Sequence, residues 1–205
     1  MPQRDKNSML RDLKLGWVEF TSRSWVVAMV VTFAAINACF ESMLQVLGPL
    51  AFDKGDNGPK YWSYNLAALT VGMMLGSILA LKVKFSRPLA ISMLLISTSA
   101  LWDFAIALEL PILFAVIGAL FSGFAVEIFM VNWNTSMQKH IPEESFSRVT
   151  SYDAFGSYGL APLGIVVAGP IAAAIGVSNA LWLTGGITCV AAILSLFVKS
   201  VRNLR

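Results

Sequence analysis

Six long apolar segments, separated by short stretches that carry charge, Pro or Gly, dominate this 205-residue chain. They span 25–47, 61–81, 88–108, 111–134, 149–175 and 178–198, so each is 21 to 27 residues long. About 20 apolar residues in a helix are enough to cross the hydrocarbon core of a bilayer. The sequence therefore predicts an all-α, polytopic membrane protein in which six transmembrane helices form a bundle, with the lipid bilayer as a partner.

The composition excludes the other broad classes of protein. Hydrophobic residues make up 57% of the chain and charged residues only 13%, whereas soluble proteins carry roughly 25% charged residues. A soluble surface could not be covered with so few charges. Disordered chains are poor in apolar residues, so disorder is excluded by the same numbers.

The basic residues predict how the segments are oriented. Two of the fifteen, Lys54 and Lys60, fall on one side of the predicted membrane. The other thirteen fall on the opposite side: Arg4, Lys6, Arg11, Lys14, Arg23, Lys82, Lys84, Arg87, Lys139, Arg148, Lys199, Arg202 and Arg205. Cytoplasmic loops carry the excess of Lys and Arg. This split predicts cytoplasmic termini in a cell (inner) membrane, and it explains the pI near 9.0 without a nucleic-acid partner.

Three parts are expected along the chain: a cytoplasmic arm over 1–24, the bundle over 25–198 and a cytoplasmic tail over 199–205. In the arm, Leu10, Leu13, Trp17 and Phe20 recur at helical spacing with charges between them. This pattern is typical of an amphipathic helix on the membrane surface. A linker helix leading into the first span explains it equally well.

Most Trp and Tyr side chains lie near predicted span ends: Trp17, Trp25, Trp133 and Tyr152 at the inner side, and Tyr61, Trp62, Trp102 and Trp182 at the outer side. Amphipathic rings favour the headgroup level of a bilayer. The pattern therefore predicts an aromatic belt, although ordinary packing would also place aromatic side chains there.

Polar side chains inside the spans are the candidate functional residues. Asn37, Glu41 and Gln45 are four residues apart and therefore share one helix face. A charge at mid-bilayer costs at least about 2.5–3.5 kcal/mol, so an acid at this depth is expected to serve function, with a structural hydrogen bond as the alternative. We expect these three residues to line a substrate or proton path. Glu127 in the fourth span is a further candidate, and Asp103 is either functional or interfacial.

Glycine spacing predicts how two of the spans behave. Ala68, Gly72, Gly76 and Ala80 follow one another at intervals of four residues. Small residues in such a stripe allow close packing of membrane helices. The fifth span contains Gly156, Gly159, Pro162, Gly164, Gly169 and Pro170. We expect it to bend or open locally, which a membrane helix tolerates only beside protein or a cavity.

Enzymatic chemistry is not expected. The single histidine, His140, falls in a predicted cytoplasmic loop and cannot act as a base inside the membrane. The sequence has no HExxH motif, no paired Cys/His metal spacing and no GxxxxGK[ST] phosphate-binding loop. No cofactor and no metal ion are therefore predicted.

Two stretches resemble a known family. In 132–169 the matching positions are Gln138, Pro142, Arg148, Val149, Ser151, Asp153, Gly156 and Ser157; in 72–88 they are Gly72, Gly76 and Arg87, while an acid usual in that loop motif is missing. These stretches resemble the C-terminal half, spans seven to twelve, of major facilitator superfamily transporters. The resemblance is closest to the bacterial efflux branch that includes macrolide and siderophore exporters.

The resemblance implies a function and a partner. It implies alternating access and proton-coupled efflux of a small amphiphilic molecule. Glu41, the acid inside the first span, is our candidate for the proton-linked group. The resemblance also implies that Arg148, Asp153, Gly72, Gly76 and Arg87 belong to inner-surface motifs that accompany conformational change. The family uses two six-helix halves, so a second half is expected: this chain is a fragment from a truncated or split gene, half of a two-chain transporter, or one copy of a homodimer. The alternatives are a self-contained six-span homo-oligomeric channel or carrier, and a truncated remnant that transports nothing.

Overall fold

The computed structural model describes the backbone of residues 6–53 and 57–204, and the side chains from Leu13 onward within those ranges. Several residues used in the predictions above lie outside the described residues or have undescribed side chains: Arg4, Lys6, Leu10, Arg11, Lys54 and Arg205. The described part of the chain is helical throughout, with short connections.

The helices, in chain order, are α1 (Lys6–Thr21), α2 (Ser24–Ser42), η1 (Met43–Leu47), α3 (Gly48–Ala51), α4 (Gly58–Lys82), α5 (Pro88–Ala107), α6 (Ile112–His140), α7 (Glu143–Tyr158), α8 (Ala161–Ile175), α9 (Val177–Ser195) and α10 (Lys199–Arg202). Six continuous stretches are long and apolar enough to cross a membrane: α2 with η1 and α3, α4, α5, α6, α7 with α8, and α9. The expectation of an all-α, six-span membrane protein is confirmed.

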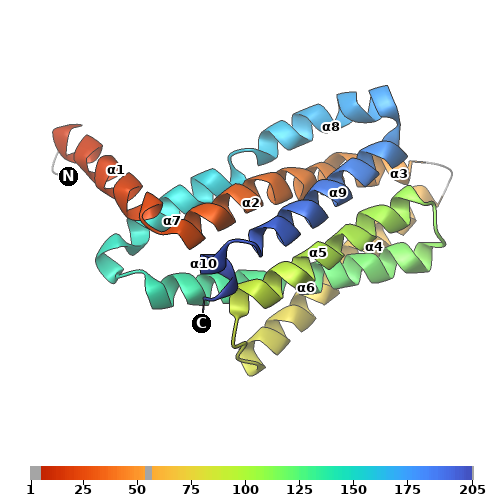
Figure 1. Ribbon diagram of the computed structural model, residues 1–205. Coiled ribbons are helices and arrows are strands. Elements are labelled where there is room, and N and C mark those ends of the chain that lie inside the picture. The colour runs from red at the N-terminus through yellow and green to blue at the C-terminus, as the bar shows by residue number, and fades with distance from the viewer. Residues whose placement is uncertain (1–5, 54–56, 205) are drawn as a thin grey trace, which may run out of the picture.

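The helices pack in an order that differs from their order along the chain. Helix α6 lies between α4 and α5; α5 packs on α9, and α9 packs on α2. Helices α7 and α8 pack on α2 from another side (Figure 1). Helices α4 and α7–α8 are thus at the flanks, and α2, α5, α6 and α9 form the centre of the bundle.

Two clusters of buried apolar side chains hold this centre together. One includes Trp25, Met93, Phe129 and Val149, and the other includes Met43, Trp102 and Leu181. The first lies at the end of the bundle where both termini are found, because Val201 of α10 belongs to it and Ser24 Oγ donates to Ser200 Oγ at 3.0 Å. We call this the basic end, because basic residues lie at the helix ends that meet there: Arg23 before α2, Lys82 at the end of α4, Arg87 before α5, Lys139 at the end of α6 and Lys199 at the start of α10.

The fourth and fifth spans are longer than predicted at the basic end. Helix α6 continues to His140 and α7 begins at Glu143, so the expected loop shrinks to Ile141 and Pro142. Lys139 and Arg148 are helical, and His140 is the last residue of α6. Acidic residues fill the first turn of α7, where the positive end of the helix dipole favours them. This polar helix start has none of the apolar signal by which the spans were found.

The fifth span is broken, as expected. Helix α7 ends at Tyr158, Gly159 follows it, and α8 starts at Ala161. Pro162 has no N–H and cannot donate to the carbonyl of Tyr158 four residues earlier. The direction of the chain changes visibly between α7 and α8 (Figure 1).

The first span has an irregularity that the sequence analysis missed. Residues Met43–Leu47 form a π-helical turn, and Gly48 N–H bonds to the carbonyl of Met43, five residues back. Pro49 follows immediately. Proline cannot donate an amide hydrogen to Gln45 O, and its ring would collide with that carbonyl in a regular helix. The π-turn thus lies directly before this proline and includes Gln45.

Glycines bring α4 and α6 into close contact, as the small-residue stripe predicted. A Cβ on Gly72 would lie 2.0 Å from Leu120 O, and one on Gly76 would lie 2.7 Å from Phe124 O. From the other helix, a Cβ on Gly123 would lie 2.0 Å from Leu69 O. Only glycine allows these backbones to approach so closely.

The aromatic belt is only partly supported. Trp25, Trp102 and Trp133 are buried inside the bundle, with Trp102 only 1% exposed. Trp102 Nε1 donates to Asn65 Oδ1 at 2.9 Å, so its polar atom bonds to protein. For these three residues, packing is the correct interpretation.

Helix α1 packs against α7 at the basic end. Tyr152 OH donates to Leu13 O at 2.9 Å, and the Tyr152 ring stacks on Phe20 with centroids 5.8 Å apart. Gly16 is buried at this contact. Leu13 and Trp17, predicted to share the apolar face with Phe20, are about half-exposed, because α1 docks through Gly16 and Phe20.

Candidate functional site

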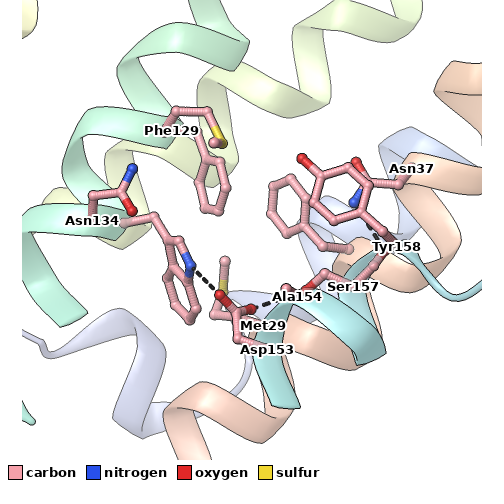
Figure 2. Close-up of a pocket in the computed structure, with 11 residues that line it drawn as sticks. Met29, Asn37, Phe129, Asn134, Asp153, Ala154, Ser157 and Tyr158 are labelled. Carbon is pink, nitrogen blue, oxygen red and sulfur yellow. Dashed lines mark hydrogen bonds between the residues drawn. The ribbon is translucent and has the colours of Figure 1, made fainter. Parts of the chain in front are cut away.

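Two adjoining pockets lie where α2, α6 and α7 meet. The first, of about 110 Å³, lies toward the basic end and is shown in Figure 2. The second, of about 100 Å³, also reaches α5 and α9. Their linings share Phe33, Asn37, Phe129, Met130 and Tyr158. The two pockets therefore form one polar and aromatic site, which we call the α2–α6–α7 site.

Asp153 is the acid of the first pocket, and Figure 2 shows its two partners. Trp133 Nε1 donates to Asp153 Oδ2 at 3.0 Å, and Ser157 Oγ donates to Oδ1 at 3.0 Å. Asp153 lies ten residues into α7, about 15 Å along the helix from Glu143. Its position is therefore in the pocket wall rather than at the start of the helix.

Asn37 connects α2 to the broken span. Its Nδ2 donates to Ser157 O at 2.9 Å, two residues before Gly159. A carbonyl at a helix break lacks its regular partner and needs another donor inside a membrane. Asn37 supplies that donor and also lines both pockets.

Glu41 and Asp103 are the acids of the second pocket. Gln45 Nε2 donates a hydrogen bond to Glu41 Oε2, so two residues of the predicted polar stripe do meet. Thr184 Oγ1 donates to Asp103 Oδ1 at 2.7 Å, which places Asp103 against α9 inside the bundle rather than at its surface. Ser122 Oγ also lines this pocket; it is buried and has no hydrogen-bond partner among the described residues.

The remaining predicted residues lie away from the pockets. Glu127 is on the side of α6 that meets α4, because a Cβ on Gly76 would lie 3.1 Å from Glu127 Cβ. Gly72 and Gly76 belong to that helix contact. Arg87 is exposed, just before α5.

Arg148 is separated from Asp153 and faces α1. Its Cβ lies 3.3 Å from where a Cβ on Gly16 would be, and its buried Nε has no hydrogen-bond partner among the described residues. The pKa of Glu19 in α1 lies below its ordinary value, first because Arg23 donates a hydrogen bond of 2.7 Å to its carboxylate, and further because Arg23 and Arg148 are positive. Arg148 thus belongs to the junction between α1 and α7.

Acids and aromatic rings dominate the electrostatics of the α2–α6–α7 site. Three carboxyl groups line it, those of Glu41, Asp103 and Asp153, and its described lining includes no Lys, Arg or His. Within the described residues, no group of three His, Cys, Asp or Glu side chains could hold a metal ion.

Sequence reasoning missed the aromatic part of this site. Phe33 and Phe129 stack with centroids 4.0 Å apart, and Phe129 is followed by Trp133 at 6.0 Å. Phe129 and Trp133 are one helical turn apart in α6, but the same spacing occurs in many apolar spans. The polar residues of this stretch, Glu127, Asn132 and Asn134, give no sign that aromatic rings gather beside them.

Comparisons with family models, with curated proteins and with solved structures found no match to this chain. The class of the protein follows from its fold and its site. It is a membrane protein with six candidate spans and an acidic, aromatic pocket between them.

Proposed function

We propose that this chain is one six-helix half of a secondary transporter of the major facilitator type, and that it moves a small molecule by alternating access, as proton-coupled efflux. The sequence resemblance supports the family. The observation that carries the proposal is the α2–α6–α7 site. Its pockets lie between helices, and acids and amides such as Asp153, Glu41 and Asn37 line them.

The side of the bundle on which the pockets open carries polar groups that need protein or water beside them. Asn134 and Gln45 are exposed there, and Glu41 is half-buried. Lipid cannot satisfy such groups, so polar residues in membranes face protein or a water-filled cavity. A second six-helix half would cover this side and enclose the path, with the polar groups between the two halves.

Two irregular helix positions flank the path. The π-turn at Met43–Leu47 and the break at Gly159 both interrupt regular hydrogen bonding in helices that line the pockets. Discontinuous helices form the binding sites of many secondary transporters. These positions support a bundle that changes shape during transport.

The proposal assigns an orientation and residue roles. The basic end faces the cytoplasm in a cell (inner) membrane, following the positive-inside rule. Glu41 is the proton-linked acid, with Asn37 and Gln45 lining its path and Glu127 a second acid in the same bundle. Gly72, Gly76, Arg87, Arg148 and Asp153 belong to the inner-surface motifs that accompany the conformational change.

Cysteine accessibility tests the proposal without a known substrate. In a Cys39→Ala, Cys189→Ala background, we would place one cysteine at Asn134 near the basic end, or at Gln45 near the other end. A charged, membrane-impermeant thiol reagent is then applied to native membranes from either side. Alternating access predicts reciprocal labelling: imposing a proton gradient raises labelling at one position and lowers it at the other.

The same experiment separates the rival functions. An open homo-oligomeric channel would label at both positions at once, and a remnant would not respond to the gradient; either result would contradict the proposal. Val166→Cys is the matched control. Val166 is 70% exposed on α8 and lies outside both pocket linings, so lipid should protect it from a charged reagent.

A further inference from the structure

One carboxylate and several aromatic rings line the first pocket. Phe33, Phe129 and Trp133 form an aromatic wall through successive ring contacts, at 4.0 Å and 6.0 Å between centroids. Asp153 and Tyr158 come from α7 on another side of the pocket (Figure 2). A cation is attracted to the face of an aromatic ring, most strongly when it is shielded from water.

Asp153 keeps acceptor capacity for a bound group. Each of its oxygens accepts one hydrogen bond, from Trp133 and from Ser157. An ionised carboxylate has about four acceptor positions, so each oxygen can accept a further hydrogen bond. Both present donors are neutral, and they orient the carboxylate without cancelling its charge.

The adjoining pocket extends the same electrostatic pattern. Glu41 and Asp103 also receive hydrogen bonds from neutral donors, Gln45 and Thr184. The described lining of the two pockets contains three carboxyl groups and no basic side chain, so an anion entering them would find no positive charge to pair with. A cation would neutralise charge that the membrane disfavours.

Size and polarity limit the bound species further. An engineered apolar cavity of about 150 Å³ holds one benzene molecule, so adjoining pockets of about 110 Å³ and 100 Å³ suit a body of about one ring with a small charged head. Ile96, Val126 and Met130 give the second pocket an apolar surface. The unpaired hydroxyl of Ser122 adds one polar contact there.

We infer that the α2–α6–α7 site binds an organic cation, an ammonium group joined to an apolar body, as the species that the transporter moves. The ammonium group lies between Asp153 and the aromatic wall, and the apolar body extends toward Met130. This inference rests on the proposed transport function and adds the chemical class of its substrate.

Binding to the full chain in lipid nanodiscs tests the inference. Equilibrium dialysis would compare radiolabelled phenyltrimethylammonium with benzenesulfonate, a ring of similar size and opposite charge, and empty nanodiscs would correct for partition into lipid. We expect saturable binding of the cation and none of the sulfonate. Asp153→Asn should weaken cation binding about tenfold or more, because the charge is lost while the side-chain shape stays similar.

Two further variants make the test sharper. Phe129→Leu keeps the carboxylate but removes a ring, so it should weaken cation binding several-fold even if Asp153→Asn fails to fold. Asp53→Asn is the matched control: Asp53 is exposed in the connection after α3, and its loss should change nothing. Equal binding of cation and sulfonate, or unchanged cation binding in both pocket variants, would overturn the inference.

Failure of the inference can be told from failure of the proposed function. If the two cysteines label reciprocally and the chain nevertheless prefers benzenesulfonate, the transport proposal stands and the cation is wrong. If the cation binds as expected but labelling never responds to a gradient, the chain holds a cation pocket without transport. That result contradicts both the proposed function and the cation's role as cargo.

Discussion

Trp133 of α6 and Asp153 of α7 are joined by a hydrogen bond from Nε1 to Oδ2 at 3.0 Å. Only Ile141 and Pro142 connect these two helices, yet their backbones approach closely at few points. The bond therefore ties α6 to α7 across the pocket. It also fixes the orientation of the one carboxylate in that pocket.

Trp133→Phe should loosen this tie. The substitution keeps an aromatic ring against Trp25 and Phe129 but removes the N–H donor. Losing one donor to a partly buried carboxylate costs about 1–3 kcal/mol, so we expect SDS-induced unfolding at a lower SDS fraction. The control is Trp17→Phe, at a ring that is 53% exposed. An equal effect of the two substitutions would show that the bond contributes nothing.

Asn37→Ala should destabilise the broken span. Without Nδ2, Ser157 O loses its cross-helix donor near the break, and an unsatisfied buried polar group costs about 1–3 kcal/mol. Hydrogen exchange of amides around Gly159 should become faster. Thr32→Ala is a suitable control because Thr32 Oγ1 bonds only to Ala28 O within its own helix. Unchanged exchange in Asn37→Ala would contradict the structural role of this bond.

Gly72→Ala should separate α4 from α6. The new methyl group would lie 2.0 Å from Leu120 O, so one helix must move away. Overpacking of this kind costs about 1–3 kcal/mol, measurable as a lower midpoint of thermal unfolding in detergent. Gly186→Ala adds the same methyl group in α9 with nothing within 4 Å, and it should be neutral or slightly stabilising. A midpoint of Gly72→Ala at or above that of Gly186→Ala would refute the close contact.

Tyr152→Phe should partly release α1 from α7. The hydroxyl bond to Leu13 O is lost while stacking on Phe20 remains, so we expect a modest loss of about 0.5–1.5 kcal/mol. Tyr152→Ala removes the ring as well and should free α1 further. Hydrogen exchange of the α1 amides should rise in that order. If neither variant changes exchange, α1 is held by other contacts.

The number and type of the spans could be predicted because a bilayer imposes a simple rule on the sequence. Apolar runs such as 61–81 and 88–108 differ from α4 and α5 by only a few residues. The break near Gly159 was also expected, because Pro162 removes a backbone donor whatever the tertiary context.

The site was harder to predict because it depends on which helices meet. Asn37 and Glu41 were selected as polar groups inside a span, a local property. Asp153 was assigned to the inner surface because it lies near the predicted start of the fifth span at residue 149. Helix α7 begins six residues earlier, and Asp153 lies in the pocket wall. The partner of Asp153, Trp133, is twenty residues away in sequence, and no spacing rule relates them.

Glu41→Gln tests the proton-linked role directly. Glutamine has a similar shape but cannot ionise, so proton-driven flux through the assembled two-half transporter should fall at least about tenfold, while exchange that moves no proton should persist. Proteoliposomes with an internal pH-sensitive dye measure the first, and substrate counterflow measures the second. Glu144→Gln, at the exposed start of α7, is the matched control and should retain both activities. Wild-type proton-driven flux in Glu41→Gln would remove Glu41 from the coupling step.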